Sequence, residues 1–384
     1  MSRDTQVRFW SGMAGIDAAS WNALAGDYPF MRHEFLAALE DTGCVAQATG
    51  WSPHHLLLGD PAQPQVLAPL YEKAHSWGEF VFDFAWARAW ESRGLKYYPK
   101  LLLAIPFTPA SGPRMLCRAT GAAAEQQRLD ALAAIAADAR ARERSSAHAL
   151  FIDEPLRAAA AAAGWLLRRD CHFQWRTRGY RDFEDFLASF AADKRKKANR
   201  ERRRVAEQGI AFEVRSGAQL DAAVLREIYA LHAATFIRHG HEPYLTAEFF
   251  IRVAAALGEN FIATLAWREG QLVATAIYFR SRDTLYGRYW GASGDFHSLH
   301  FEACYHQGIE YCIRNGLQRF EPGTQGEHKL ARGFEPVFTW SAHWLADRTL
   351  REAVVRFLER ETTAIGEYAD AAGQHTPFRD RPAP

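Results

Sequence analysis

The order of the predicted elements repeats once along this chain, and this repeat constrains the fold more than any other feature. In the second half, a strand at 211–215 precedes two helices, three strands, a further helix and a short strand at 319–321. The first half gives the same order, beginning with a strand at 6–11. Apolar residues at alternate positions predict the strands, and those three or four positions apart predict the helices. The repeat therefore predicts an α/β protein made of two tandem halves of one kind.

The length of 384 residues also favours two domains, because a single hydrophobic core seldom serves a chain of this size. We expect one domain at 1–178 and a second at 179–370. The second would open with a long basic helix at 181–208, which Gly209 ends, as glycine commonly does. We expect the tail, 371–384, to be flexible.

Overall composition excludes some classes of protein and leaves others open. The formal net charge of +1 indicates no particular partner, and no two of the five cysteines have CxxC spacing. Reduced thiols in a cytoplasmic protein are the simplest interpretation. The N-terminus lacks the apolar core of a signal peptide, and no run of about 18 apolar residues predicts a membrane span. Peripheral contact with the inner face of a membrane stays open.

The stretch 283–334 concentrates titratable side chains among aromatic residues and glycines. Such groups at the ends of elements, beside glycines that let a ligand approach the backbone, are what a reactive cleft requires. A solvated loop would not need Tyr289, Trp290 and Tyr305 beside them. This stretch is therefore the first candidate for a functional site.

Several long segments in both halves resemble one family of proteins. They read TGWSPHHLLL, PLYEKAHSWGEFVFDFAWARAW, YYPKLLLAIPFTPASGPRML, LYGRYWG, LHFEACYHQGIEY and EPGTQGEHKLARGFEP. On these segments the chain resembles the FemAB-like predicted N-acyltransferases of the GNAT superfamily, also described as peptidoglycan biosynthesis/recognition proteins. The resemblance implies two tandem GNAT-like domains with mixed sheets, each of which opens a V-shaped slot, linked by a long basic helix. It also implies bacterial origin and N-acyl transfer.

Transfer of an acyl group to an amine requires a group that takes a proton from the amine, since an alkyl amine with a pKa near ~10 is mostly protonated at neutral pH. The loop GTQGEHK follows a core strand and precedes a turn, so both of its ends are fixed. We expect Glu327 or His328 of this loop to be the general base. His300 and Glu302 lie at the start of a predicted helix, where a GNAT-type donor approaches. For Glu302, favourable interaction with the helix dipole is an equally good explanation. The usual glycine-rich phosphate loop is missing there, and Gly291 and Gly294 give only a loose substitute.

A second group of residues could bind substrate. Asp83 lies within the apolar segment VFDFAW, where an unpaired carboxylate would cost several kcal/mol to bury, so Lys100 or Arg88 is its expected partner. Packing alone could explain the aromatic residues of that segment. The predicted substrate-binding residues are Asp83, Tyr98, Lys100, Arg288, Trp290, Tyr305, Gln325, Lys329 and Arg332, of which Lys329 and Arg332 would bind anions.

The run KRKKANRERRR at 194–204 carries more like charges than a neutral structural helix would tolerate. It predicts contact with tRNA phosphates, a CoA 3′-phosphate or anionic lipid headgroups, although a solvated face is the alternative. The residues assigned to binding of an anionic donor are Lys194, Arg195, Lys197 and Arg200. The histidines lack the spacing of a metal motif, and no metal is predicted.

Together these features predict an N-acyltransferase that moves an acyl group from acyl-CoA or acyl carrier protein to an amine of a lipid or cell-envelope precursor. No tightly bound cofactor is expected. One alternative is a Fem-type aminoacyltransferase that uses aminoacyl-tRNA and acts on a peptidoglycan precursor or peptide. The other is a non-catalytic protein that binds an envelope ligand.

Overall fold

The computed structural model describes residues 6–324 and 326–379, which divide into two compact units. The first unit combines Met1–Asp170 with Phe338–Gly366, and the second combines Cys171–Val337 with Glu367–Pro384. This division differs from the expected domains 1–178 and 179–370, because residues 338–366 return to the first unit. The chain changes unit twice within strands, once in β9 (Leu166–Arg176) and once in β15 (Glu335–Leu345).

The strands of the first unit form two groups. One is a four-stranded antiparallel sheet in the order β1-β3-β4-β7. The other runs in the order β2-β5-β6-β8-β15, with a parallel pair only between β6 and β8 among these strands. The bounds are β1 (Val7–Trp10), β2 (Trp51–Pro53), β3 (His55–Asp60), β4 (Gln63–Ala68), β5 (Leu70–Lys73), β6 (Lys100–Leu103), β7 (Leu116–Cys117) and β8 (Ser146–Leu150).

Helices pack around these strands and complete the first core. Leu132, Ile135 and Ala139 of α4 are fully buried against Leu101, Leu103 and Ala147 of the sheet. The bounds are α1 (Ala18–Ala25), α2 (His33–Asp41), α3 (Phe84–Glu91), α4 (Gly121–Ala141), α5 (Glu154–Ala162) and α12 (Arg348–Gly373), which runs on into the second unit. A separate cluster joins Trp86 and Trp90 of α3 to Leu350, Val354 and Leu358 of α12.

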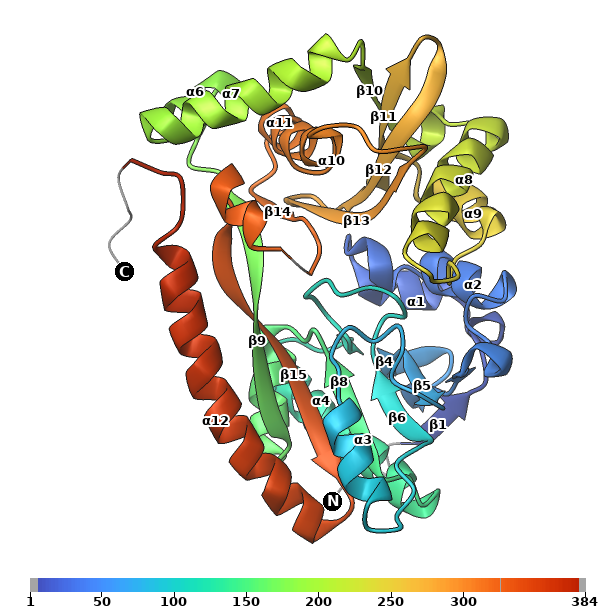
Figure 1. Cartoon of the computed structure of the whole chain (residues 1–384). Coiled ribbons are helices and arrows are strands. Elements are labelled where there is room, and N and C mark those ends of the chain that lie inside the picture. Colours follow the sequence, from blue (N-terminus) through green and yellow to red (C-terminus); the bar gives the residue numbers. More distant parts are fainter. Residues whose placement is uncertain (1–5, 325, 380–384) are drawn as a thin grey trace. The chain divides into compact units, whose positions relative to one another are not determined.

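The second unit contains a mixed sheet in the order β10-β11-β12-β13-β14-β9 (Figure 1). The first four strands are antiparallel, and β13 and β14 are parallel. The bounds are β10 (Ala211–Ser216), β11 (Phe261–Arg268), β12 (Gln271–Arg280), β13 (Thr284–Ala292) and β14 (Arg319–Glu321). Within this unit, Trp175 and Arg176 of β9 pair with Phe320 and Arg319 of β14.

Helices cover both faces of this sheet. α8 and α9 lie on one side of the strands, and α10 and α11 lie on the other (Figure 1). The bounds are α6 (Phe183–Ala188), α7 (Ala192–Glu207), α8 (Ala222–Arg238), α9 (Ala247–Leu257), α10 (Leu299–Phe301) and α11 (Gln307–Arg314). A π-helical turn (Glu302–His306) joins α10 to α11, and a 3₁₀ helix, η7 (Glu327–Arg332), follows β14.

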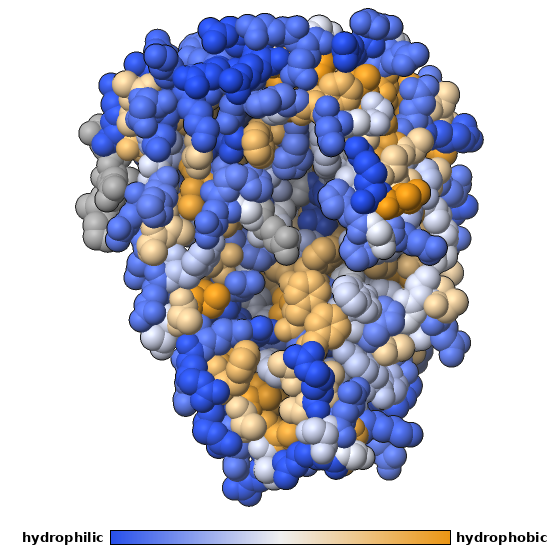
Figure 2. Space-filling view, viewed as in Figure 1, coloured by the Kyte–Doolittle hydropathy of each residue, from blue (hydrophilic) through white to orange (hydrophobic). Residues whose placement is uncertain are grey.

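The expected single helix at 181–208 is two helices, α6 and α7. The break lies at residues 189–191, where Phe190 forms a β-bridge with Phe378 and the Ala191 amide donates to the carbonyl of Pro377. These bonds to another segment replace the next helical hydrogen bonds. The hydrophilic side chains of α7 gather along the upper edge of the molecule (Figure 2).

The same contacts correct the expectation of a flexible tail at 371–384. α12 extends to Gly373, and Phe378 is buried beside Phe190, with 5.5 Å between the ring centroids. Residues 371–379 are therefore packed on the second unit. The remainder of the predicted tail, 380–384, lies outside the described residues.

Candidate functional site

The site begins where two neighbouring strands of the second unit part. β13 pairs with β14 over Thr284–Tyr286, opposite Arg319–Glu321. Beyond Tyr286 the two strands share no further ladder in the described part of the chain, since Pro322 ends β14 and has no amide hydrogen to donate. The second half of β13 therefore borders an opening in the sheet.

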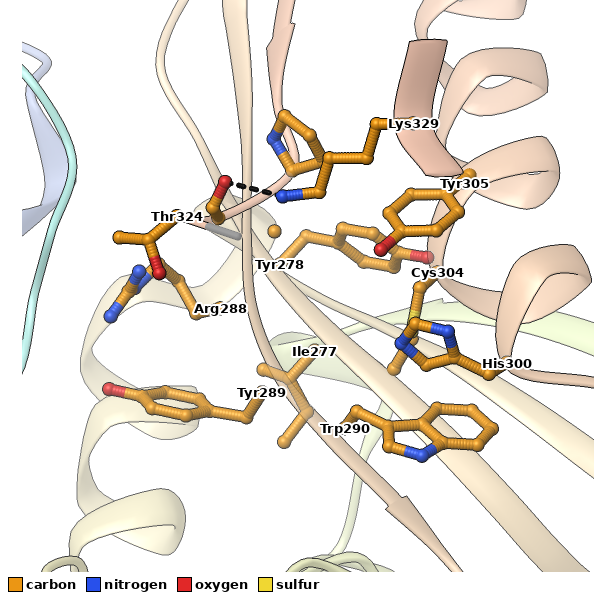
Figure 3. Close-up of a pocket in the computed structure, with 14 residues that line it drawn as sticks. Ile277, Tyr278, Arg288, Tyr289, Trp290, His300, Cys304, Tyr305, Thr324 and Lys329 are labelled. Atoms are coloured by element: carbon orange, nitrogen blue, oxygen red, sulfur yellow. Dashed lines mark hydrogen bonds between the residues drawn. The ribbon is translucent and has the colours of Figure 1, made fainter. Parts of the chain in front are cut away.

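This opening contains a cavity of about 200 Å³. Figure 3 shows Arg288 and Trp290 reaching it from β13, while His300, Cys304 and Tyr305 come from the helical segment on the other side. The lining residues are Ala276, Ile277, Tyr278, Gly287, Arg288, Tyr289, Trp290, His300, Cys304, Tyr305, Pro322, Gly323, Thr324 and Lys329. Five of the residues predicted from the sequence are thus brought together here: Arg288, Trp290, His300, Tyr305 and Lys329.

The π-helical turn carries two residues that line the cavity, Cys304 and Tyr305. The phenol of Tyr278 on β12 donates a hydrogen bond to the carbonyl of Ala303, which lies inside the turn. A π turn inserts one extra residue per turn, and such turns are frequent at functional sites. Here it accompanies the placement of Cys304 and Tyr305 in the lining of the cavity. Burial raises the pKa of both the Cys304 thiol and the Tyr305 phenol, so both are neutral.

Lys329 is the most unusual group at the cavity. Its side chain lies in η7, the residue is 1% exposed, and its Nζ donates to the carbonyl of Gly323 over 2.7 Å (Figure 3). Within the described residues, no carboxylate lies within ion-pair distance of this amine. Burial lowers the pKa of Lys329 to about 7. At physiological pH, the protonated and the neutral form of this amine are therefore both populated.

His300 belongs to two cavities at once. A second cavity, of about 420 Å³, has a lining that also contains Trp290 and His300, and it extends to Arg238 and His239 at the end of α8. Burial is the largest cause that lowers the pKa of His300 to about 4, and the neighbouring His328, Arg332 and Lys329 act in the same direction. Its imidazole is therefore neutral at pH 7, with the indole of Trp290 edge-on at 5.2 Å.

His328 is not among the described lining residues, but it contacts two that are, Tyr305 and His300. Its Nε2 is 2.9 Å from the hydroxyl of Tyr305, which does line the cavity. Burial, with the charges of Lys329 and Arg332, lowers the pKa of His328. A Cβ at residue 326 would lie 2.1 Å from the His328 ring, and φ there is +111°, so only glycine allows this arrangement.

Glu302 and Arg332 are held away from the cavity by ion pairs with α7. Glu302 is buried, and its carboxylate contacts His306 Nδ1 at 3.0 Å and Arg202 Nε at 3.2 Å. Burial acts to raise the pKa of Glu302, but these hydrogen bonds and charges outweigh it and hold the pKa below its ordinary value. Arg332 pairs with Glu201 at 2.8 Å. Neither residue is among those that line the cavity in the described chain.

The remaining predictions in this half fall outside the cavity. Glu327 is exposed at the start of η7, and Gln325 lies outside the described residues. Lys194, Lys197 and Arg200 are exposed on α7, and Arg195 is half-buried there. Their proposed roles in catalysis and donor binding stay predictions.

Asp83, Tyr98 and Lys100 lie in the first unit and form part of a buried network. Lys100 is fully buried and pairs with Asp83, and it lies 2.8 Å from Glu79. Of the two expected partners of Asp83, Lys100 and Arg88, the structure pairs it with Lys100. Burial acts to raise the pKa of Asp83, yet the Lys100 charge, the His148 ring and the hydrogen bonds from Lys100 and Ser76 together outweigh it and lower the pKa. Tyr98 joins the network through Ser76, at 2.8 Å.

Sequence reasoning missed several lining residues. Tyr278, Thr324 and Cys304 carried no motif, and the π-helical turn that presents Cys304 leaves no mark in apolar periodicity. Tyr289 lies within the candidate stretch, between Arg288 and Trp290, but strand alternation places it on the face opposite to theirs, so strand periodicity does not predict that it lines the same cavity.

The two glycines of the predicted substitute for a phosphate loop differ in their surroundings. A Cβ at residue 291 would lie 2.4 Å from the backbone nitrogen of His232 in α8, so Gly291 serves the packing of α8 on the sheet. Gly294 is the remaining glycine of that predicted substitute, and it lines the second cavity. In the described residues, no group of three or more His, Cys, Asp or Glu side chains is placed to hold a metal ion. No helix within the described ranges is long and apolar enough to cross a membrane.

Solved structures with a similar fold were found at low sequence identity. The C-terminal domain of a putative lysylphosphatidylglycerol synthetase from Agrobacterium fabrum has a TM-score of 0.53 and 10% identity, covering 90% of this chain and 96% of that one. L-PGS from Bacillus licheniformis has a TM-score of 0.51 and 11% identity, covering 85% and 96%. FemX has a TM-score of 0.50 and 12% identity, covering 80% and 91%.

The predicted α/β fold class is confirmed: the chain has two units with mixed sheets, and its fold is similar to those of the solved structures named above. The search of curated proteins found no match. A family model, FemAB-like, described as peptidoglycan biosynthesis/recognition, matches residues 12–380. This match covers nearly the whole sequence, and the chain belongs to the FemAB-like family.

Proposed function

We propose that this protein transfers an acyl or aminoacyl group from an activated donor to an amine of a cell-envelope precursor or lipid. The observation that carries the proposal is Lys329, a buried amine without a carboxylate partner among the described residues, at a cavity between two parting strands. Membership of the FemAB-like family supports the envelope precursor as the acceptor.

The two cavities of the second unit suit a reaction of two substrates. They share Trp290 and His300, so ligands in the two spaces would meet at these side chains. The larger cavity has Arg238 and His239 in its lining, and the smaller has Lys329 and Arg288. A donor in one cavity and an acceptor amine in the other would place the carbonyl carbon near the attacking nitrogen. Such positioning converts a bimolecular step into an effectively unimolecular one.

Lys329 is suited to move the proton. The neutral form of the acceptor amine attacks the donor carbonyl with its nitrogen lone pair, a C–N bond forms, and neutral Lys329 takes a proton from that nitrogen. The resulting ammonium faces the tetrahedral oxyanion and then returns the proton to the departing sulfur or oxygen as the C–S or C–O bond breaks. A pKa of about 7 suits both steps, because transfer is most efficient when the pKa of the group lies near the working pH.

The preferred donor is a thioester, carried by CoA or by acyl carrier protein. An aminoacyl-tRNA is the second candidate, and one observation favours it: Gly291 is occupied in packing against His232, which leaves the ordinary phosphate loop of a CoA-binding GNAT fold unbuilt. In both cases the protein carries out the same carbonyl chemistry, with sulfur or oxygen as the leaving atom.

A donor screen tests this proposal. The purified full chain would be incubated with an amine-bearing peptidoglycan precursor and, separately, with acyl-CoA, acyl carrier protein loaded with an acyl group, and aminoacyl-tRNA. Mass spectrometry would follow acylation of the precursor amine. We expect one donor class to yield product, and RNase treatment to abolish the product only where the donor is aminoacyl-tRNA.

Lys329→Arg is the matched variant for the screen, because it keeps a cation in the loop but cannot supply a neutral base. We expect it to lower the rate by at least about 100-fold. If no donor acylates any amine while the precursor still binds, the protein is a binding protein and the proposed function is wrong.

A further inference from the structure

The two faces of α7 differ sharply in how their charges are satisfied. Lys196, Lys197 and Arg200 are exposed and have no carboxylate partner within ion-pair distance in the described part of the chain. Ala198 and Val205 on the opposite face are buried, with Glu201 and Arg202 beside them. The outer face is thus a cationic stripe, and the inner face is fixed to the second unit.

The stripe follows the helical repeat. Lys196, Arg200 and Arg203 recur at intervals of four and three residues, and Lys197 and Arg204 lie next to them on the same side. Arg203 pairs with Glu207 at 3.4 Å, so among the described residues Lys196, Lys197 and Arg200 carry the unpaired charge of the stripe. From residue 194 to residue 204 the helix rises about 15 Å. Hydrophilic side chains gather over α6 and α7 in the space-filling view (Figure 2). Like charges this close repel one another, and an anionic partner would relieve the repulsion.

The inner face of α7 reaches the cavity through two ion pairs. Glu201 contacts Arg332 at 2.8 Å, and Arg332 in turn donates to the carbonyl of His328 over 2.6 Å. Arg202 contacts Glu302, the first residue of the π-helical turn, at 3.2 Å. The first pair ends in η7, which supplies Lys329, and the second ends in the turn that supplies Cys304 and Tyr305.

We propose that α7 binds an anionic phospholipid surface with its outer face, and that Glu201 and Arg202 transmit this contact to the loop and the turn that line the cavity. The inference deepens the proposed function, since it places the reaction at a membrane where an amine-bearing lipid or lipid-linked precursor would be reached.

The shape and composition of the stripe favour a bilayer over RNA. α7 contains no Phe, Tyr, Trp or His that could stack on an exposed base, which is how proteins hold single-stranded RNA. Its cations are spread along one straight face instead of converging on a point. A planar array of headgroups matches that layout, and each Lys or Arg near such a surface contributes separately to binding.

Vesicle co-sedimentation tests the contact. We expect the full chain to bind vesicles of phosphatidylglycerol and phosphatidylcholine, not vesicles of phosphatidylcholine alone, and to release as NaCl is raised, because salt screens exposed charges. The variant Lys196→Glu/Lys197→Glu/Arg200→Glu should bind at least about 100-fold more weakly. The control Arg88→Glu/Arg93→Glu/Lys96→Glu makes the same charge change at exposed residues of the first unit and should bind far better than the α7 variant.

Hydrogen–deuterium exchange tests the transmission. Addition of the anionic vesicles should slow amide exchange in 299–306 and 327–332 of the wild-type chain. Glu201→Gln/Arg202→Gln removes both inner ion pairs but keeps the outer stripe, so this variant should bind the vesicles and lose the protection. Equal protection in the variant would overturn the transmitting role.

Two results would overturn the membrane contact itself. One is equal loss of binding in the α7 variant and the control, which would reduce the effect to net charge. The other is binding of an RNA oligonucleotide without binding of the vesicles. None of these measurements uses a donor or an acceptor, so they can succeed where the proposed acyl transfer fails, and the reverse.

Discussion

Lys329 donates a hydrogen bond through its Nζ to the carbonyl of Gly323, 2.7 Å away, and this contact is the only hydrogen bond of the amine in the described structure. A backbone carbonyl does not compensate for burial of a full positive charge, so the neutral amine is favoured. Burial beside an uncharged carbonyl therefore explains why the pKa of Lys329 is lowered and why its amine can accept a proton as a base.

The first prediction concerns stability and pH. The pKa of Lys329 is about 7 in the folded chain and near 10.5 in the unfolded chain. Between these values the unfolded chain binds more protons, so this group makes stability rise with pH, by up to about 1.4 kcal/mol per pH unit. Lys329→Met should remove that slope and stabilise the protein at pH 7. Urea unfolding of both proteins at pH 7, 8 and 9 measures the difference.

Lys73 provides the control for that prediction. It is fully buried in the first unit, and burial lowers its pKa to about 7 as well. Lys73→Met should change the pH dependence of stability in the same direction. Because Lys73 lies in the other unit and not in the lining of the cavity, only Lys329→Met should abolish transfer. Equal loss of activity in both variants would contradict the special role of Lys329.

A second prediction separates the candidate bases. Glu327 is exposed and His328 contacts the cavity through Tyr305, whereas Lys329 lines it. Glu327→Gln should therefore change kcat/KM by less than about threefold, while loss of the general base should cost about 100-fold or more. Steady-state kinetics of Glu327→Gln and Lys329→Arg measures this. A large effect of Glu327→Gln alone would show that the Glu327 carboxylate is the general base.

A third prediction concerns the buried pair in the first unit. Lys100→Met would leave the carboxylates of Asp83 and Glu79 buried without their shared cation, and removal of one partner of a buried pair typically costs about 3–5 kcal/mol. The double variant Lys100→Met/Asp83→Asn should be less destabilised than the single one. Urea unfolding of the set tests this. If the double variant loses the sum of the two single effects, the two side chains do not interact.

The sequence predicted the architecture well because hydrophobic period and turn residues determine it locally. β14 (Arg319–Glu321) was predicted with its bounds, and the order of elements predicted two similar halves. The split of α6 from α7 was missed because it depends on Phe378, nearly 190 residues from Phe190 along the chain. Local periodicity has no access to such a contact.

The site was predicted in part for the same reason. Arg288 and Trp290 alternate with Tyr289 on one strand, and His300 follows it, so their proximity could be expected. Whether a charged side chain of this stretch lines the cavity depends on whether a partner elsewhere in the fold holds it in an ion pair. Arg332 and Glu302 are paired with Glu201 and Arg202, a hundred residues or more away in the sequence. Lys329 was assigned to anion binding, and its burial suggests a base.

The pH dependence of acyl transfer tests the central claim most directly. With the donor that yields product and with both substrates saturating, kcat of the wild-type chain should rise with pH through a midpoint near 7, the pKa of Lys329, and level off above it. Lys329→Arg should lack this rise and stay at least about 100-fold below the wild type at pH 8. A Lys329→Arg variant that keeps both the midpoint and the rate would contradict the account.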